Sequence, residues 1–407
     1  MLLLNSNPSL RSDYYKVVRK VKMKKSKLIS LSAVSALVLS LVAVFTAPVN
    51  AATDFKGAAC ALEGSVKTVS GVTYLCSRVN ESLVYGEGRK LSGTLNVLCG
   101  AQELWCSTMT TAFQKKTGIT TKFVRLSAGE GLTRLIASKN NPEFDVWHGG
   151  PNDTYIAGRI AGVLDTYKSP NRAMLIPAHQ DADGYWTGVY TGALGFCSNT
   201  NELKRLGLRA PTSWADLLNP KLKGNIMMAH PGTSGTAYTA LYTQVIRLGS
   251  ENAAIDYMKL LNKNVLSYTR SGAGPTGPLG RGEVAVGIVF SHDCTAAKLL
   301  GNPVVVSFPS EGTGYEVGAV GLVKGAKNSL AAKAYIDFAL SAEAQNLGPD
   351  KAQSFQVLTN SNAKANRNMV NLKKLTLVKY DVEAAGTAAA ALKKRFDAEV
   401  ALTSSAK

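Results

Sequence analysis

Short apolar segments alternate with longer amphipathic ones along this chain, and this alternation restricts the fold more than any other feature. In the first part of the body the pattern predicts a strand, a helix, a strand, a helix and a strand, over residues 93–98, 104–117, 122–126, 127–139 and 144–148. Such an alternation is typical of a mostly parallel sheet with helices on both faces. The sequence therefore predicts an α/β fold.

A Gly- and Tyr-rich stretch, residues 184–195, interrupts the alternation, and we expect it to cross between two lobes. A second α/β series follows, with strands and helices expected at 214–218, 223–228, 231–248, 284–290, 304–308, 317–323, 329–340 and 342–347, and a helical segment at the C-terminus. The prediction is a two-lobed α/β fold with two hinge crossings and a ligand cleft. Lobe 1 comprises residues 93–188 and 309–407, with the C-terminal helices, and lobe 2 comprises residues 189–308.

Length and charge limit the classes of function. The 407 residues are enough for two lobes that each bury a core. The formal charge is +18, but residues 1–28 carry +7 of it, which leaves +11 for the rest. No dense basic run remains in the body, so we set nucleic-acid binding aside, whereas a moderate positive balance favours anionic partners.

The basic N-terminal run is followed by an uncharged apolar stretch, residues 28–45, and by the sequence TAPVNAA. Val49 and Ala51 are small enough for the two pocket positions of a signal peptidase that cuts after Ala51. We therefore expect a signal peptide at residues 1–51. Residues 1–22 are a long leader, and Met23 is a possible start. The alternative is an uncleaved membrane anchor. Export predicts a periplasmic or extracellular, envelope-associated location.

Export also changes how the six cysteines are interpreted. Six cysteines allow 15 pairings, and sequence alone cannot choose among them. Local order favours Cys60–Cys76 and Cys99–Cys106, which leaves Cys197–Cys294. The first pair would hold a small N-terminal module, residues 53–92. A reactive thiol is the minor alternative.

Polar residues at predicted strand ends indicate an anion site. Ser127 to Gly131 and Thr233 to Thr236 both open helices with hydroxyls and glycines, and a helix N-terminus stabilises an anion through its free N–H groups and its dipole. Each alone is also an ordinary helix cap. On opposite lobes they would clamp one anionic group. Gly149 and Gly150 let a ligand approach bare backbone, and residues 271–275 form a further Gly-rich loop.

A second set of polar residues suits sugar hydroxyls. His292 and Asp293 end one predicted strand, and Glu316 precedes another. Carboxylates and a neutral imidazole accept hydrogen bonds that hydroxyls donate. The alternatives are a divalent metal site and a structural salt bridge. Trp147, Trp186 and Tyr315 could stack on a ligand, although such residues more often belong to the core or to the rim of a site. No catalytic motif stands out, so we expect no enzyme and no cofactor.

From about residue 90 to residue 347 the chain resembles extracellular solute-binding proteins of ABC importers, in the group that includes ferric-ion, phosphonate and phosphosugar binders. The resemblance lies in five segments: CGAQELWC at 99–106, DVWHGG at 145–150, TSGTAY at 233–238, FSHD at 290–293 and EGTGYEVG at 311–318. It implies a type II periplasmic-binding-protein fold that closes on a small anionic solute, as a monomer, and delivers it to a membrane permease.

The resemblance also implies a ligand site closest to that of the phosphosugar members. The phosphate end would be held by Gln102, Ser127, Gly129, Gly149, Thr233, Ser234, Gly235 and Thr236. The hydroxyl end would be held by Trp147, His292, Asp293, Tyr315 and Glu316. Ferric-ion members carry an adjacent Tyr-Tyr pair late in the chain, whereas here the only such pair is Tyr14-Tyr15. A ferric-ion site is therefore disfavoured and is kept only as the alternative. Two less favoured hypotheses are an exported phosphoester hydrolase and a cell-surface interaction protein.

Overall fold

The structure, a computed structural model, describes residues 54–401. The expected signal peptide, the possible start at Met23 and the expected cleavage site lie outside the described residues. Within residues 54–401, no helix combines the length and the apolar character that a membrane span needs.

Lobe 1 is built on three parallel strands, each followed by a helix at its carboxyl end. The strands are β5 (Thr94–Cys99), β6 (Thr120–Arg125) and β7 (Val146–Pro151), and the helices are α1 (Glu103–Thr117), α2 (Ala128–Ala137) and α3 (Asn152–Ile160). Gly118 ends α1 in the left-handed conformation, with φ of 79°, which glycine adopts at little cost. Helices α9 (Ser329–Ala339) and α10 (Ala342–Lys351) complete the lobe. The alternation predicted here is confirmed.

Lobe 2 repeats this plan. Its strands are β10 (Ile226–Ala229), β11 (Val265–Thr269), β12 (Val286–Phe290) and β13 (Val304–Ser307). Its helices are α4 (Thr200–Leu206), α5 (Gly235–Leu248), α6 (Glu251–Asn262), α7 (Thr276–Arg281) and α8 (Ser291–Leu299). The Ser234 hydroxyl caps α5 by accepting from the Ala237 N–H at 3.4 Å. The expected helix at 214–218 is a 3₁₀ helix, Ala215–Leu218. Other 3₁₀ helices span Pro170–Met174, Pro177–His179, Pro220–Leu222 and Leu372–Lys374.

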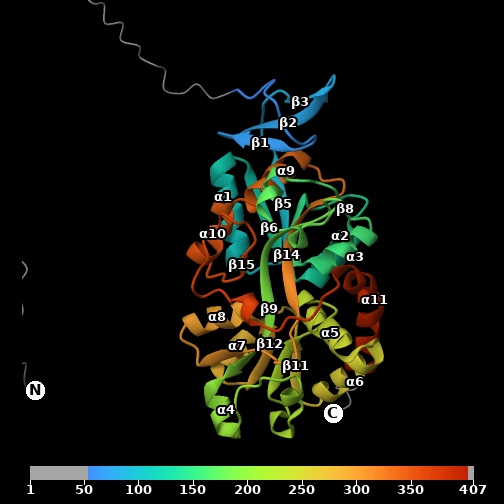
Figure 1. Cartoon of the computed structure of the whole chain (residues 1–407), viewed down its shortest axis with the longest axis vertical. Coiled ribbons are helices and arrows are strands. Elements are labelled where there is room, and N and C mark those ends of the chain that lie inside the picture. Colours follow the sequence, from blue (N-terminus) through green and yellow to red (C-terminus); the bar gives the residue numbers. More distant parts are fainter. Residues whose placement is uncertain (1–53, 402–407) are drawn as a thin grey trace, which may run out of the picture. The chain divides into compact units, whose positions relative to one another are not determined.

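Strand β9 (Thr187–Asn199) joins the two sheets, as the Gly- and Tyr-rich stretch predicted. Its first half pairs with β14 (Tyr315–Val323) in lobe 1 and its second half pairs with β12 in lobe 2, so β9 runs through both lobes (Figure 1). Every residue of β9 is buried. The short strands β8 (Leu164–Asp165) and β15 (Val357–Leu358) add to β14 and β9.

The chain passes between the lobes a third time. After α10 and β15, residues 376–378 run beside Thr313, whose N–H donates to the Thr376 carbonyl at 2.9 Å and whose carbonyl accepts from the Val378 N–H at 2.9 Å. The chain then enters helix α11 (Val382–Glu399). The sequence indicated only two crossings, because this segment carries no strand pattern.

Helix α11 departs from the expectation that all C-terminal helices belong to lobe 1. Its buried residues Ala385, Ala389, Leu392 and Phe396 belong to the apolar core that lies around α5 and α6 of lobe 2. Its first turns also pack on α3 of lobe 1, where Gly386 lies against Ile156. The helix therefore belongs to both lobes, and the expected boundaries of the lobes stay a prediction.

The N-terminal module is a small antiparallel sheet of β1 (Val66–Val69), β2 (Val72–Val79), β3 (Ser82–Tyr85) and β4 (Arg89–Lys90). Val66 is buried in the core of lobe 1, and its N–H donates to the Tyr167 hydroxyl at 3.3 Å. The Lys333 ammonium donates to the Gly64 carbonyl at 3.3 Å. The module therefore docks on lobe 1.

Three disulfides link the six cysteines. They join Cys60 to Cys76, Cys99 to Cys106 and Cys197 to Cys294, with Cα–Cα distances of 6.0, 6.0 and 5.5 Å. This is the pairing that local order favoured. Since every cysteine is paired, none is a free thiol.

Candidate functional site

A cavity lies between the two lobes, where the strands of both sheets end. The space available to the centres of water-sized molecules is about 50 Å³. Its walls come from the starts of α1, α2, α5 and α8 and from strands β9 and β14. In open α/β sheets, ligands bind beyond the carboxyl ends of strands. The cavity is therefore the candidate ligand site.

Lobe 1 contributes a guanidinium and a hydroxyl to this cavity. Arg125 is the last residue of β6, and Ser127 precedes α2. The Arg125 Nε donates to the Ala101 carbonyl at 3.2 Å, and its Nη1 donates to the Ser127 Oγ at 3.4 Å. Arg125 is the only lysine or arginine that lines the cavity among residues 54–401. These contacts hold a positive charge beside the start of α2.

Lobe 2 contributes the start of α5. Ser234, Gly235 and Thr236 line the cavity. In the part of the chain that the structure describes, no hydrogen bond uses the N–H of Gly235 or of Thr236. Gly272 and Ala273, from the Gly-rich loop before α7, also line the cavity, and Gly272 lies against the Thr236 side chain. Unused N–H groups in a first helical turn are donors for an anion.

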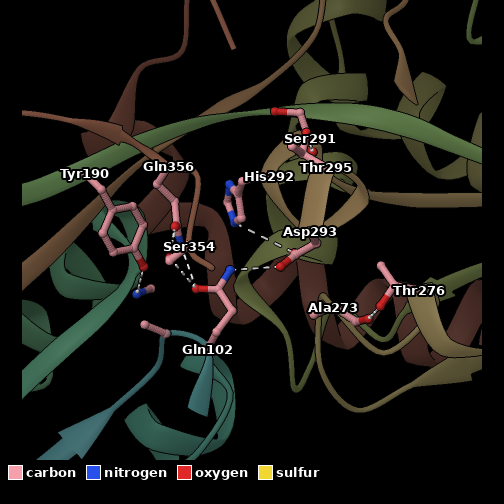
Figure 2. Close-up of polar contacts among 12 residues, drawn as sticks. Gln102, Tyr190, Ala273, Thr276, Ser291, His292, Asp293, Thr295, Ser354 and Gln356 are labelled. Atoms are coloured by element: carbon pink, nitrogen blue, oxygen red, sulfur yellow. Dashed lines mark hydrogen bonds and ion pairs between the residues drawn. The ribbon is translucent and has the colours of Figure 1, made fainter. Parts of the chain in front are cut away.

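The other wall of the cavity is made of carboxyl, imidazole and amide groups (Figure 2). The Gln102 Nε2 donates to the Asp293 Oδ1 at 2.9 Å, and the Gln356 Nε2 donates to the Gln102 Oε1 at 2.8 Å. The His292 Nε2 lies 3.8 Å from the Asp293 Oδ2. Gln102 comes from lobe 1 and Asp293 from lobe 2, so this network joins the lobes.

Burial sets the protonation of two groups in this wall. It lowers the pKa of His292, against an opposite effect of Asp293, so the imidazole is neutral at pH 7. Burial raises the pKa of Glu316 well above its ordinary value, and Asp293 and Asp153 raise it further. The Glu316 carboxyl group therefore holds its proton more readily than an exposed glutamate does. The His292 Nδ1 is buried and has no hydrogen-bond partner among residues 54–401. This end can donate to and accept from hydroxyls.

The structure brings together most of the residues that the sequence indicated. Eight of them line the cavity: Gln102, Ser127, Ser234, Gly235, Thr236, His292, Asp293 and Glu316. Their role as ligand contacts stays a prediction. Gln102 was expected at the phosphate end, but it contacts Asp293 and so lies with the hydroxyl set.

Five expected residues do not line the cavity. The N–H of Gly129 donates to the Thr233 carbonyl at 2.9 Å, so these two residues contact each other across the lobes. The starts of α2 and α5 therefore face one another in this structure. Gly149 lies behind Gly150, which does line the cavity.

Both aromatic residues expected at the hydroxyl end pack elsewhere. Trp147 is fully buried in the lobe 1 core and stacks on Tyr155, with ring centroids 4.2 Å apart. Tyr315 packs against Tyr380, with centroids 6.0 Å apart. The expectation that Trp147 stacks on a ligand is wrong, because strand β7 turns this side chain into the core.

Sequence reasoning missed three polar residues of the cavity: Arg125, Tyr190 and Gln356. Arg125 could have been found, because it is a charged residue at the carboxyl end of a predicted strand, two positions before an expected anion contact. The Tyr190 hydroxyl accepts from the Gly150 N–H at 3.0 Å. Gln356 gave no signal, since it lies far along the chain in a segment without a motif.

Metal coordination was an alternative for the acidic wall and for the ferric interpretation. Among residues 54–401, no group of three or more His, Cys, Asp or Glu side chains is placed to hold a metal ion.

Comparison with known proteins places this architecture in a family. Residues 161–382 match the family described as bacterial extracellular solute-binding protein. An uncharacterised protein of Haemophilus influenzae is 39% identical over 299 residues, which cover 72% of this chain and 86% of that protein.

Two solved structures are similar over 76% of this chain and all of their own length. One is the periplasmic binding protein AfuA from Actinobacillus pleuropneumoniae with exogenous fructose-6-phosphate bound, with 39% identity and a TM-score of 0.74. The other is the periplasmic binding protein P5PA, with 35% identity and a TM-score of 0.73. Both are binding proteins, not enzymes, and have the periplasmic-binding-protein fold. The chain therefore belongs to the bacterial extracellular solute-binding proteins, the periplasmic or extracellular receptors that serve ABC importers.

Proposed function

We propose that this protein binds a small organophosphate, a phosphosugar or a related phosphonate, in the cleft between its lobes and delivers it to an ABC permease. We further propose that it does so as a monomer after export. The observation that carries the ligand class is the convergence of two helix starts and one guanidinium on a single cavity.

The electrostatics of the cavity favour an anion where Arg125 and the starts of α2 and α5 meet. The N-terminus of a helix carries about half a positive charge, so an anion that lies between the starts of α2 and α5 is stabilised by both helices. Arg125 adds a full positive charge beside them. A phosphate or phosphonate oxygen can accept from the Arg125 guanidinium, the Ser127 hydroxyl and the free N–H groups of α5.

The opposite wall explains why the proposed ligand is larger than inorganic phosphate. This wall offers both donors and acceptors: the neutral His292, the Glu316 carboxyl group, whose pKa is raised by burial, and the Asp293–Gln102 pair. Hydroxyls of a sugar can pair with both kinds of group. The bound fructose-6-phosphate of the AfuA structure, at 39% identity, supports a phosphosugar.

Titration calorimetry against a defined panel tests the proposal. The panel contains fructose 6-phosphate, glucose 6-phosphate, 2-aminoethylphosphonate, fructose, inorganic phosphate and ferric citrate. We expect the tightest binding from a compound that has both an anionic and a polar end. Fructose and phosphate should each bind at least about 10-fold more weakly, because each leaves one wall of the cavity unpaired. Binding of ferric citrate alone would contradict the proposal.

Replacing Arg125 tests the anion end directly. Arg125→Gln should weaken binding of the preferred phosphorylated ligand by about 10- to 100-fold, because a charge-assisted hydrogen bond is lost. The matched control is Arg134→Gln on the same stretch of chain, since Arg134 pairs with Glu143 at 2.6 Å outside the cavity. Equal affinities of the two variants would show that Arg125 does not bind the anion.

A further inference from the structure

A contact between the lobes adjoins the anion end of the cavity without lining it. The N–H groups of Gly129 and Glu130, in the first turn of α2, donate to the Thr233 carbonyl at 2.9 and 3.3 Å. A Cβ atom on Gly129 would lie 2.9 Å from that carbonyl oxygen and closer still to the Gly232 carbonyl oxygen. Only glycine at 129 therefore allows the lobes to approach this closely.

A charged pair crosses the lobes at the same place. The Glu130 carboxylate accepts from Arg270 of lobe 2 through Nε at 2.7 Å and through Nη2. Its other oxygen accepts from the Ser127 N–H at 3.2 Å. The Thr233 hydroxyl donates to the Arg270 carbonyl at 2.9 Å. Glu130 thus links Arg270 of lobe 2 to Ser127, which lines the anion end of the cavity.

The position of Glu130 creates a conflict that Arg270 resolves. A carboxylate in the first turn of a helix stabilises that helix, but next to a bound phosphate the same charge is repulsive. Pairing with a guanidinium neutralises the carboxylate. Because Arg270 belongs to lobe 2, that pairing is available only while the lobes are together.

We propose that Glu130 and Arg270 are positioning residues that couple closure of the lobes to binding of the anion, and this rests on the proposed function. In the open protein Glu130 disfavours the anion. In the closed protein Arg270 removes this penalty, and the Gly129–Thr233 contact holds the two helix starts in place. The bound anion is therefore retained by residues that do not touch it.

Release and association rates of fructose 6-phosphate, measured by stopped-flow fluorescence in the intact mature protein, test the coupling. Arg270→Gln should raise the release rate about 3- to 5-fold and change the association rate less, because the Arg270 side chain is 84% exposed and water screens the pair. The effect should disappear in 0.5 M NaCl. Arg134→Gln is again the matched control.

The double variant separates charge neutralisation from simple adhesion between the lobes. Glu130→Gln keeps an oxygen that can accept from Ser127, but it carries no charge. If Arg270 acts by neutralising Glu130, adding Glu130→Gln to Arg270→Gln restores the slow release. A double variant that releases as fast as Arg270→Gln alone overturns the coupling.

Gly129→Ala supplies a measurement that does not depend on charge. This variant should fail to contract when fructose 6-phosphate is added, as measured by small-angle X-ray scattering, and it should bind more weakly. Full contraction of the variant contradicts the inference. Absence of fructose 6-phosphate binding by the unaltered protein overturns the coupling as stated here. Absence of binding by every phosphorylated compound of the panel overturns the proposed function as well.

Discussion

At the scale of single residues, burial changes the chemistry of side chains near the cavity more than their neighbours do. His148 on β7 is 1% exposed, and its Nδ1 lies 2.8 Å from the Tyr335 hydroxyl. Burial lowers the pKa of His148 to about 4 from an ordinary 6.5. The imidazole is therefore kept neutral and packs in the core, although it lies only two residues before Gly150, which lines the cavity.

This lowered pKa predicts a loss of stability in acid. Between pH 6.5 and 4 the unfolded chain binds a proton at His148, whereas the native protein does not. The free energy of unfolding should therefore fall as the pH falls, by up to about 3 kcal/mol. Urea unfolding at pH 7 and pH 4.5 measures this decrease in the free energy of unfolding. The decrease should be smaller for His148→Gln.

The comparison with a variant is necessary because another group acts in the opposite direction. Burial raises the pKa of Asp337 to about 7, so its contribution to stability is lost as the pH rises towards 7. Only the difference between the unaltered protein and His148→Gln isolates the histidine. Identical pH dependences would contradict the assignment.

At the scale of elements, helix α11 shows what the sequence can predict about an element and what it cannot. Its Ala- and Lys-rich pattern predicts a helix, which the structure confirms at Val382–Glu399. Where such a helix packs depends on distant partners, because Leu392 and Phe396 fit a core formed by α5 and α6. Helix and strand periods are local, whereas docking is not.

The contact of α11 with α3 gives a prediction at this scale. A Cβ atom on Gly386 would lie 2.6 Å from the Ile156 Cγ2 and 2.7 Å from the Asp153 carbonyl oxygen. Gly386→Val should therefore lower the free energy of unfolding by about 1–3 kcal/mol, because the helices must separate. Ala390→Val, at an exposed position of the same helix, should cost less than about 1 kcal/mol. Equal costs would exclude close packing as the cause.

The candidate site divides in the same way. Residues that cap helices or follow strands could be predicted, and Ser127, Ser234 and His292 do line the cavity. The partners of Gln102 could not be predicted, because Asp293 and Gln356 come from distant segments. Trp147 was misassigned since a residue in a buried strand can face either side of the sheet.

At the scale of the whole molecule, the N-terminal module and the cavity are separate features of the fold. The module contacts lobe 1 through Val66 and Gly64, and none of its residues lines the cavity. Deleting residues 54–92 should lower the melting temperature, because Val66 leaves the core of lobe 1. Affinity for the preferred ligand should change less than about 2-fold. Calorimetry of the shortened protein measures both, and a large loss of affinity would contradict this separation.

The third passage of the chain beside Thr313 has a mechanical consequence. Three roughly aligned segments between two rigid bodies act as a ribbon, which bends easily about one axis and resists torsion. The two lobes should consequently open by a hinge-bending motion about one axis, with little twisting of one lobe relative to the other. When the lobes open, the distances between them, measured by double electron–electron resonance, should increase far more near Ser234 than near Val378.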